Sequence, residues 1–158
     1  MRLEYFQLID RIVWLDVAAR QIRAVATIPK TSTIFEGHFP GHPLMPGVLL
    51  IEAMAQTSGW LVTGVSQFER MPFLAAVKDA KFRRFIVPGE VLSIESELVH
   101  EGSGFAVAHA KIVTAGEKPV SEAEIRLRVM PFPSPEFRAS MLSYAQRIEL
   151  PLGAIADG

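Results

Sequence analysis

The sequence contains no cysteine, and this absence excludes several classes of protein at once. Without thiols the chain can form no disulfide framework, no thiolate zinc site and no cysteine nucleophile. A chain without disulfides fits a reducing compartment, so we expect a cytoplasmic protein. An excess of positive charge is also missing, since the net charge is −1, and this argues against nucleic-acid binding by the whole surface.

An apolar leader and a long uninterrupted apolar run are missing as well. The N-terminus carries the acid Glu4 and no apolar core of a leader, so we expect no signal peptide. The central stretch 48–65 is interrupted by Glu52 and Gln56, so we expect no membrane span. With 158 residues, 49% of them hydrophobic, the chain should form one domain with a real core.

What the chain does contain is one unusual stretch, residues 37–47, with three prolines and three glycines. Prolines fix φ and glycines allow close approach, so this stretch predicts a rigid loop. From Val48 to Val65 apolar residues lie on nearly every side, which is typical of a helix buried inside a protein. Pro46 suits the first helical position.

Two features of this helix indicate chemistry. No Ser, Asp or Asn precedes it, so the N–H groups near Gly47 and Val48 should be free to bind developing negative charge on a ligand oxygen. Glu52 is a lone carboxylate, and Gln56 lies one turn further on, where it can orient it. A second interpretation stays open at this point: Glu52 could pair with a basic residue and merely satisfy the core.

The rest of the chain predicts strands. Residues 8–15 and 20–28 predict a hairpin, 73–77 a short strand, and three more strands follow at 91–99, 105–113 and 120–129, with turn signals between them. Short turns imply an antiparallel meander. We therefore expect the α+β class, an antiparallel sheet wrapped around one long central apolar helix, with a dimer covering what the sheet leaves exposed.

The sequence after the last strand predicts a short amphipathic helix. Ser134 can cap it, and Phe137, Met141, Tyr144 and Ile148 recur at helical spacing. We therefore expect a main domain at 1–130 and a C-terminal extension at 131–158. The helix could pack on its own sheet, or lie over a substrate channel or a partner.

Residues 37–56 resemble the signature of the β-hydroxyacyl-acyl carrier protein dehydratases of bacterial fatty acid synthesis. The resemblance extends over about residues 5–130, through 8–12, 81–84 and 87–90, and is to the broad-specificity branch, because Glu52 stands where the dehydratase/isomerase branch has aspartate. It implies the hotdog fold, a homodimer that is often part of a trimer of dimers, and no cofactor. The central motif that carries it is Gly37-His38-Phe39-Pro40-Gly41, Pro43, Met45-Pro46-Gly47-Val48-Leu49 and Glu52-Ala53-Met54-Ala55-Gln56.

The resemblance also implies the reaction and its residues. A (3R)-3-hydroxyacyl thioester on acyl carrier protein would lose water to give the trans-2-enoyl thioester, with His38 as catalytic base and Glu52 as catalytic acid, one from each protomer. Glu52, in an apolar wall, is expected to hold a proton at neutral pH. Backbone N–H groups at Gly47 and Val48 would bind the thioester oxygen, and Gln56 would support Glu52. Phe73 lies near the position of an aromatic gate to the acyl tunnel.

A basic cluster follows the helix, made of Lys78, Lys81, Arg83 and Arg84. Such a run is usually a solvated face, but the resemblance makes it a candidate docking site for acidic acyl carrier protein.

The sequence leaves three other interpretations to consider. His38, His42 and Glu36 could suggest a metal site, but a proline-broken loop with no further clustered ligands argues for no metal. A thioesterase or a CoA-ester hydratase could share the fold. A non-catalytic acyl-binding protein is the third, and the presence of both His38 and Glu52 argues against it.

Overall fold

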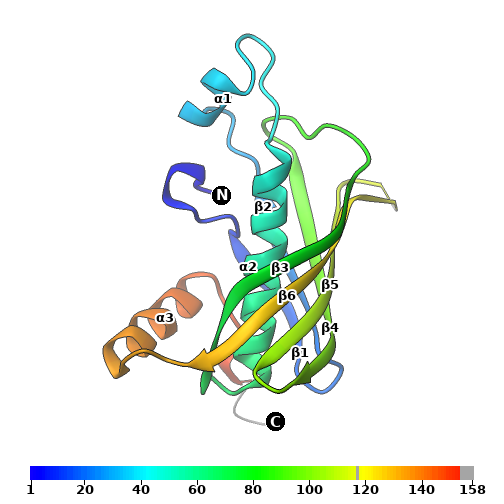
Figure 1. Ribbon diagram of the computed structural model, residues 1–158. Helices are drawn as coiled ribbons and strands as arrows, with labels where there is room; N and C mark the ends of the chain where they lie inside the picture. The colour runs from blue at the N-terminus through cyan, green and yellow to red at the C-terminus, as the bar shows by residue number, and fades with distance from the viewer. Residues whose placement is uncertain (117, 154–158) are drawn as a thin grey trace.

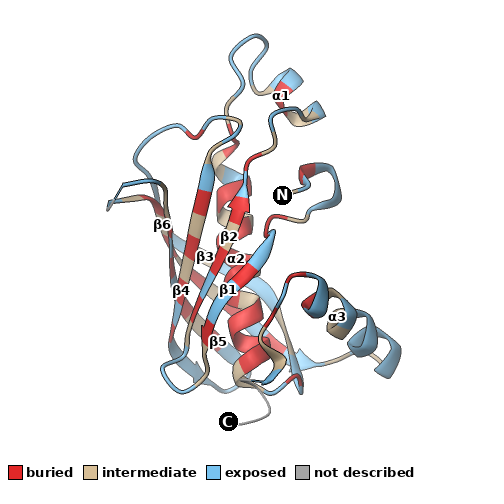
Figure 2. Ribbon diagram, turned by 180° about the vertical axis from the view of Figure 1, so that it is seen from behind, coloured by how far each residue is buried: buried red, intermediate tan, exposed pale blue. Residues whose placement is uncertain are grey.

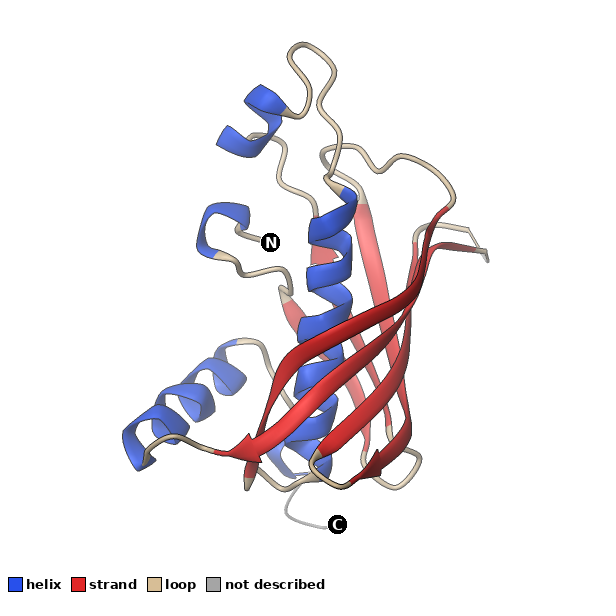
Figure 3. Ribbon diagram, in the orientation of Figure 1, coloured by secondary structure: helices blue, strands red, loops and turns tan. Residues whose placement is uncertain are grey.

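The computed structural model describes residues 1–116 and 118–153, and its centre is one long helix held in a curved antiparallel sheet (Figure 1). Figure 3 shows the sheet crossing one side of this helix while shorter helices lie on the other. The elements in chain order are η1 (Leu3–Tyr5), β1 (Arg11–Asp16), β2 (Gln21–Thr27), α1 (Thr33–Gly37), α2 (Gly47–Val65), β3 (Arg70–Phe82), β4 (Val91–Gly102), β5 (Phe105–Val113), β6 (Pro119–Pro131) and α3 (Pro135–Arg147).

The sheet has the order β1-β2-β4-β5-β6-β3, with every neighbouring pair antiparallel. The predicted hairpin and the β4-β5-β6 run are confirmed. The prediction of a short strand at 73–77 was wrong, because β3 is one strand of 13 residues at the far edge, paired with β6. Irregularities between Leu74 and Ala76 and between Lys78 and Lys81 break its side-chain alternation, which made one strand look like two segments.

The core lies between the inner face of this sheet and α2 (Figure 2). On β6 the predicted face of Ala123, Ile125, Leu127 and Val129 is buried. On β5 the inward positions are mostly alanine, so that strand approaches the helix closely. Fully buried Met54 and Leu61 on α2 each contribute about 1.5–3 kcal/mol through burial.

The start of α2 differs by one residue from the prediction. Pro46 is the N-cap, with an extended backbone (φ −60°, ψ 131°), and Gly47 is the first helical residue. The Pro46 carbonyl accepts hydrogen bonds from the N–H groups of Leu49 (3.0 Å) and Leu50 (3.3 Å), so it closes the first turn. The helix is long and apolar enough to cross a membrane, but 67% of that stretch is buried within the fold, as in the core helix of a folded domain.

The predicted C-terminal helix is present as α3, and it packs on its own chain. The Ser134 hydroxyl accepts a hydrogen bond from the Phe137 N–H (3.2 Å), so the predicted cap is formed. Tyr144 stacks on Trp60 of α2 with ring centres 5.6 Å apart. Figure 1 shows α3 beside the second half of α2. Residues 154–158 of the expected extension lie outside the described residues.

Candidate active site

Glu52 is half-buried in the second turn of α2, and Gln56 orients its carboxylate. The Gln56 Nε2 group donates to Glu52 Oε1 (3.0 Å) and to the Phe6 carbonyl (2.8 Å), while its Oε1 accepts from the Leu8 N–H (3.2 Å). Because a backbone N–H can only donate, this network fixes which way the amide points. Glu52 therefore uses Oε1 as an acceptor and keeps Oε2 for a ligand or a proton.

The interpretation that Glu52 pairs with a basic residue finds no support. Within residues 1–116 and 118–153 no lysine, arginine or histidine forms an ion pair with Glu52. Among the described residues, the only side chain that holds the half-buried Glu52 carboxylate is the amide of Gln56, and its second oxygen lies free beside apolar side chains. Burying an oxygen without a partner costs free energy, so a role in packing alone does not explain Glu52.

His38 lies at the end of α1 in a firmly held loop. Its N–H donates to the Ile34 carbonyl (3.0 Å), its own carbonyl accepts from Leu44 (2.9 Å), and its ring stacks on Phe39 at 4.3 Å. Ring atom Nδ1 lies 2.9 Å from the Leu44 carbonyl oxygen. Since a carbonyl only accepts, Nδ1 carries the hydrogen, and Nε2 of the neutral ring is left as a base.

The first amides of α2 are uncapped, as predicted. No side chain caps the helix, and Val48 is 71% exposed. Gly47 is constrained by packing, because a Cβ there would lie 3.2 Å from the ring of Phe82 at the end of β3. This arrangement leaves the N–H groups of Gly47 and Val48 at the positive end of a helix of 19 residues.

A cavity of about 380 Å³ opens beside Glu52 and runs along α2. It is mostly apolar, with Glu52 and Gln56 at one end, a composition suited to an acyl chain. The residues that line it are Tyr5, Phe6, Gln7, Glu52, Ala55, Gln56, Gly59, Trp60, Thr63, Met71, Pro72, Leu74, Leu127, Phe132, Met141 and Tyr144.

One protomer therefore brings together only part of the predicted site. Neither His38 nor the start of α2 lines this cavity. Phe73 does not line it either, because Pro72 and Leu74 do, and alternation along a strand places the residue between them on the opposite face. The sequence reasoning missed Trp60 as a lining residue, although it lies eight positions after Glu52 and thus on the same side of the helix.

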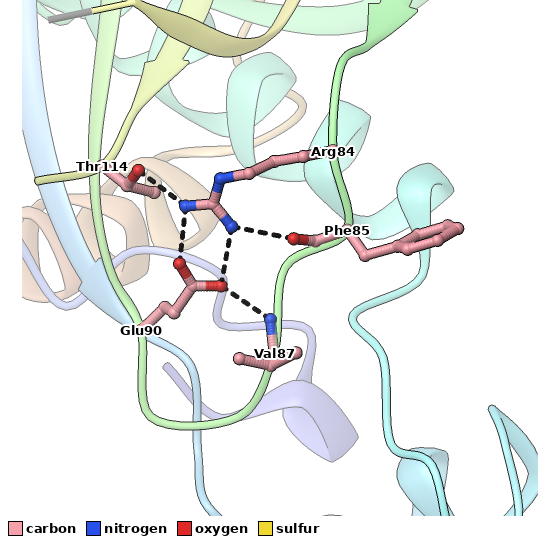
Figure 4. Close-up of polar contacts among 5 residues, drawn as sticks. All are labelled: Arg84, Phe85, Val87, Glu90 and Thr114. Atoms are coloured by element: carbon pink, nitrogen blue, oxygen red, sulfur yellow. Dashed lines mark hydrogen bonds and ion pairs between the residues drawn. The ribbon is translucent and has the colours of Figure 1, made fainter. Parts of the chain in front are cut away.

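Arg84 is one of the four basic residues predicted to dock an acyl carrier protein, and its guanidinium is bonded to neighbouring groups of its own chain (Figure 4). Its guanidinium donates to both carboxylate oxygens of Glu90 (2.6 and 3.1 Å), to the Thr114 hydroxyl (2.7 Å) and to the Phe85 carbonyl (2.8 Å). Glu90 also accepts from the Val87 N–H (2.7 Å). Hydrogen bonding by Arg84 holds the pKa of Glu90 below its usual range, against the opposing effect of burial. Arg84 clips the 84–90 turn to the sheet, and its role in docking a carrier protein stays a prediction.

This clip gives a stability prediction. Arg84→Ala should lower the free energy of unfolding at neutral pH by about 1–1.5 kcal/mol, the small end for charge-assisted bonds because the arginine side chain is 42% exposed. The pKa of Glu90 is lowered on folding, so its contribution is complete above the unfolded value and is lost as pH falls through the folded value. Urea unfolding should therefore show the difference from wild type shrinking in acid. The control Arg23→Ala removes an exposed pair with Glu95 and should cost less than about 0.5 kcal/mol; equal losses for both variants would contradict the clip.

The other three basic residues lie on the exposed face and have acidic neighbours. Lys81 and Arg83 both contact Glu122, at 3.8 and 2.8 Å, and Lys78 acts on Glu124. Hydrogen bonding by Arg83, aided by Lys81, lowers the pKa of Glu122. Basic and acidic side chains thus alternate on this exposed face, which we call the charged ladder. Docking of a carrier protein on Lys78, Lys81 and Arg83 stays a prediction.

In the described part of the chain, no three His, Asp or Glu side chains gather so as to hold a metal ion. His42, on the loop with His38, is exposed. His100 and His109 are exposed on their strands, and His109 lies 3.7 Å from Glu124. A site that works without metal or cofactor stays a prediction.

A six-stranded antiparallel sheet wrapped around one helix is the hotdog fold, which confirms the predicted fold class. A solved structure of conserved protein PA5202 from Pseudomonas aeruginosa matches with a TM-score of 0.63 at 18% identity, over 80% of this chain and 93% of that one. At that identity the likeness shows the fold alone.

Comparison at the level of sequence identifies the family. Residues 2–124 match the FabA-like domain. The chain is 39% identical over 124 residues to the 3-hydroxyacyl-[acyl-carrier-protein] dehydratase FabZ of Clostridium acetobutylicum, covering 78% of this chain and 86% of that protein. It is 35% identical over 132 residues to the FabZ of Symbiobacterium thermophilum, covering 83% and 92%. The chain belongs to the FabA-like family, and the resemblance in its central motif is confirmed.

Proposed function

We propose that this chain is a 3-hydroxyacyl-[acyl-carrier-protein] dehydratase, a hydro-lyase of fatty acid synthesis that acts in the cytoplasm. Its membership of the family and its identity to FabZ proteins support the reaction. The single observation that carries the site is Glu52, half-buried at the end of an apolar cavity with one oxygen held by Gln56 and the other free.

The chemistry follows from the atoms left free. His38 Nε2 removes a proton from C2 of the thioester, and the negative charge that develops on the thioester oxygen is bound by the N–H groups of Gly47 and Val48. Glu52 delivers a proton from Oε2 to the hydroxyl on C3. The C3–O bond breaks, water leaves, and the C2–C3 double bond forms, so protons and electrons balance without a cofactor.

The proposed roles of His38 and Glu52 point to a second copy of the chain, because Glu52 lines the apolar cavity of one copy and His38 does not. We propose a homodimer in which each copy supplies His38 to the cavity of the other, with dimers able to form a trimer of dimers. The unpaired edge of β3 supports this, since 13 residues of edge strand, most of them exposed, invite pairing. Exposed Phe82, at the end of β3, and Val48, at the start of α2, supply apolar surface for such a contact.

Docking of the carrier protein is tested by reversing the charge of basic residues on the charged ladder of β3 and β6. Lys81→Glu with Arg83→Glu should raise KM for acyl carrier protein substrates about tenfold while leaving KM for pantetheine thioesters unchanged, because only the protein substrate meets the changed charge. Arg11→Glu, exposed on β1 at the other edge of the sheet, is the matched control. Equal changes on both kinds of substrate would argue against docking there.

The reaction itself is tested with enoyl thioesters on carrier protein and on CoA. We expect hydration, seen as loss of the enoyl absorbance with no release of free thiol, and a higher kcat/KM on carrier protein. Release of thiol would identify a thioesterase, and a preference for CoA would identify a hydratase. Binding without either reaction would leave a non-catalytic acyl-binding protein.

A further inference from the structure

The far end of the cavity beside Glu52 is built by the part of the chain that follows the matched family domain. The match ends at residue 124, whereas Phe132, Met141 and Tyr144 all line the cavity. Figure 1 shows the orange α3, which carries the last two, on the side of α2 away from the sheet. The extension is therefore part of the substrate space rather than an appendage to it.

This far wall is held in place at several points. Tyr144 stacks on Trp60 with 19° between the ring planes. Phe132 stacks on buried Phe68 with 1° between their planes, and Arg138 Nε donates to the Phe68 carbonyl (2.8 Å).

The end of α3 is fixed as well. The Ile12 N–H of β1 donates to the Ile148 carbonyl (2.7 Å), and Ala145, Ile148 and Leu150 are buried. Burial raises the pKa of the Tyr144 hydroxyl, although nearby Arg147 opposes the effect, so the wall presents an uncharged ring. These contacts hold the start of α3 against the turn that follows α2 and its end against α2 and β1, so α3 forms a wall of the cavity.

The geometry limits the length of chain that fits. Trp60 follows Glu52 by eight residues, which corresponds to about 12 Å along the helix axis, and Thr63, the last residue of α2 that lines the cavity, lies about 16 Å along it. Gly59 lies just before it and leaves the passage open, since it has no side chain. We propose that the acyl chain of the substrate lies along α2 between Glu52 and the Trp60–Tyr144 pair, and that α3 sets the length limit, so that medium chains are preferred over long ones.

This inference rests on the proposed function, and its test separates the two. Hydration of crotonyl, octenoyl and hexadecenoyl pantetheine is measured for wild type, Tyr144→Ala and Tyr144→Phe. Opening the wall with Tyr144→Ala should raise the ratio of kcat/KM for hexadecenoyl over octenoyl about tenfold and leave crotonyl unchanged. Tyr144→Phe keeps the stacked ring, so the ratio of kcat/KM for hexadecenoyl over octenoyl should stay at the wild-type value. The ratio compares two substrates in one protein sample, so a loss of folded protein cancels.

A matched control and an independent variant complete the test. Leu142→Ala trims a neighbouring, partly buried residue of α3 that does not line the cavity, and should leave the ratio unchanged. Gly59→Met should block the passage before the wall and lower kcat/KM for octenoyl but not for crotonyl; a Cβ there meets only Pro72 at 3.4 Å, an ordinary contact. An unchanged ratio in Tyr144→Ala, with octenoyl hydration intact, would overturn the inference. Absence of hydration of every substrate by wild type would instead overturn the proposed function.

Discussion

Glu52→Gln should lower kcat for 3-hydroxyacyl carrier-protein dehydration by about 10²–10⁴-fold, the range expected for loss of a general acid. The substitution keeps the shape of the side chain and keeps an oxygen that can accept the hydrogen bond from Gln56. What it removes is a proton that can be given to the departing hydroxyl. KM should change little, because the acyl chain still meets the same apolar lining. Initial rates by enoyl absorbance, with thermal unfolding to confirm the fold, provide the measurement.

A second variant distinguishes the acid from its support. Gln56→Ala should cost only about fivefold in kcat, because it removes one orienting hydrogen bond worth about 1 kcal/mol while the Glu52 carboxyl group remains in place. It should also lower stability, since Gln56 fixes the N-terminal segment through Phe6 and Leu8. If Glu52→Gln kept turnover near that of wild type, Glu52 would not be the acid.

His38→Ala should cause a loss of similar size, about 10²–10⁴-fold in kcat, through loss of the base. The Leu44 carbonyl accepts from Nδ1, so Nε2 is the nitrogen that we propose as the base. His42→Ala is the matched control, because His42 shares the loop and is exposed. His42→Ala should retain nearly full rate. Comparable losses in both variants would show that the loop as a whole, and not the His38 imidazole, is needed.

Much of the fold could be predicted from the sequence because the patterns that determine it are local. The strand at 105–113 and the cap at Ser134 follow from alternation and from capping chemistry, and both are found as predicted. The position of β3 could not be predicted from the sequence. Tertiary contacts decide its pairing with β6 at the sheet edge, and its bulges interrupt the alternation of side chains.

The candidate site was predictable only in part. The pairing of Glu52 with Gln56 follows from one-turn spacing on a helix, and the structure has that hydrogen bond. The engagement of Arg84 by Glu90 and Thr114 was not visible, because Thr114 lies 30 residues away in sequence. The sequence indicated the aromatic wall only weakly. Tyr144 lies on a predicted amphipathic helix, which must pack on some surface, but only the structure shows that Tyr144 stacks on Trp60.

The assembly of each site from two protomers is tested most directly by mixed dimers. His38→Ala and Glu52→Gln chains carrying different tags are co-expressed, and dimers holding one of each are purified. If each site takes His38 from one copy and Glu52 from the other, a mixed dimer has one intact site of two, and its rate should be about half that of wild type. Each parent variant alone should remain nearly inactive. Mixed dimers as inactive as their parents would place both residues within one copy and contradict the proposed site.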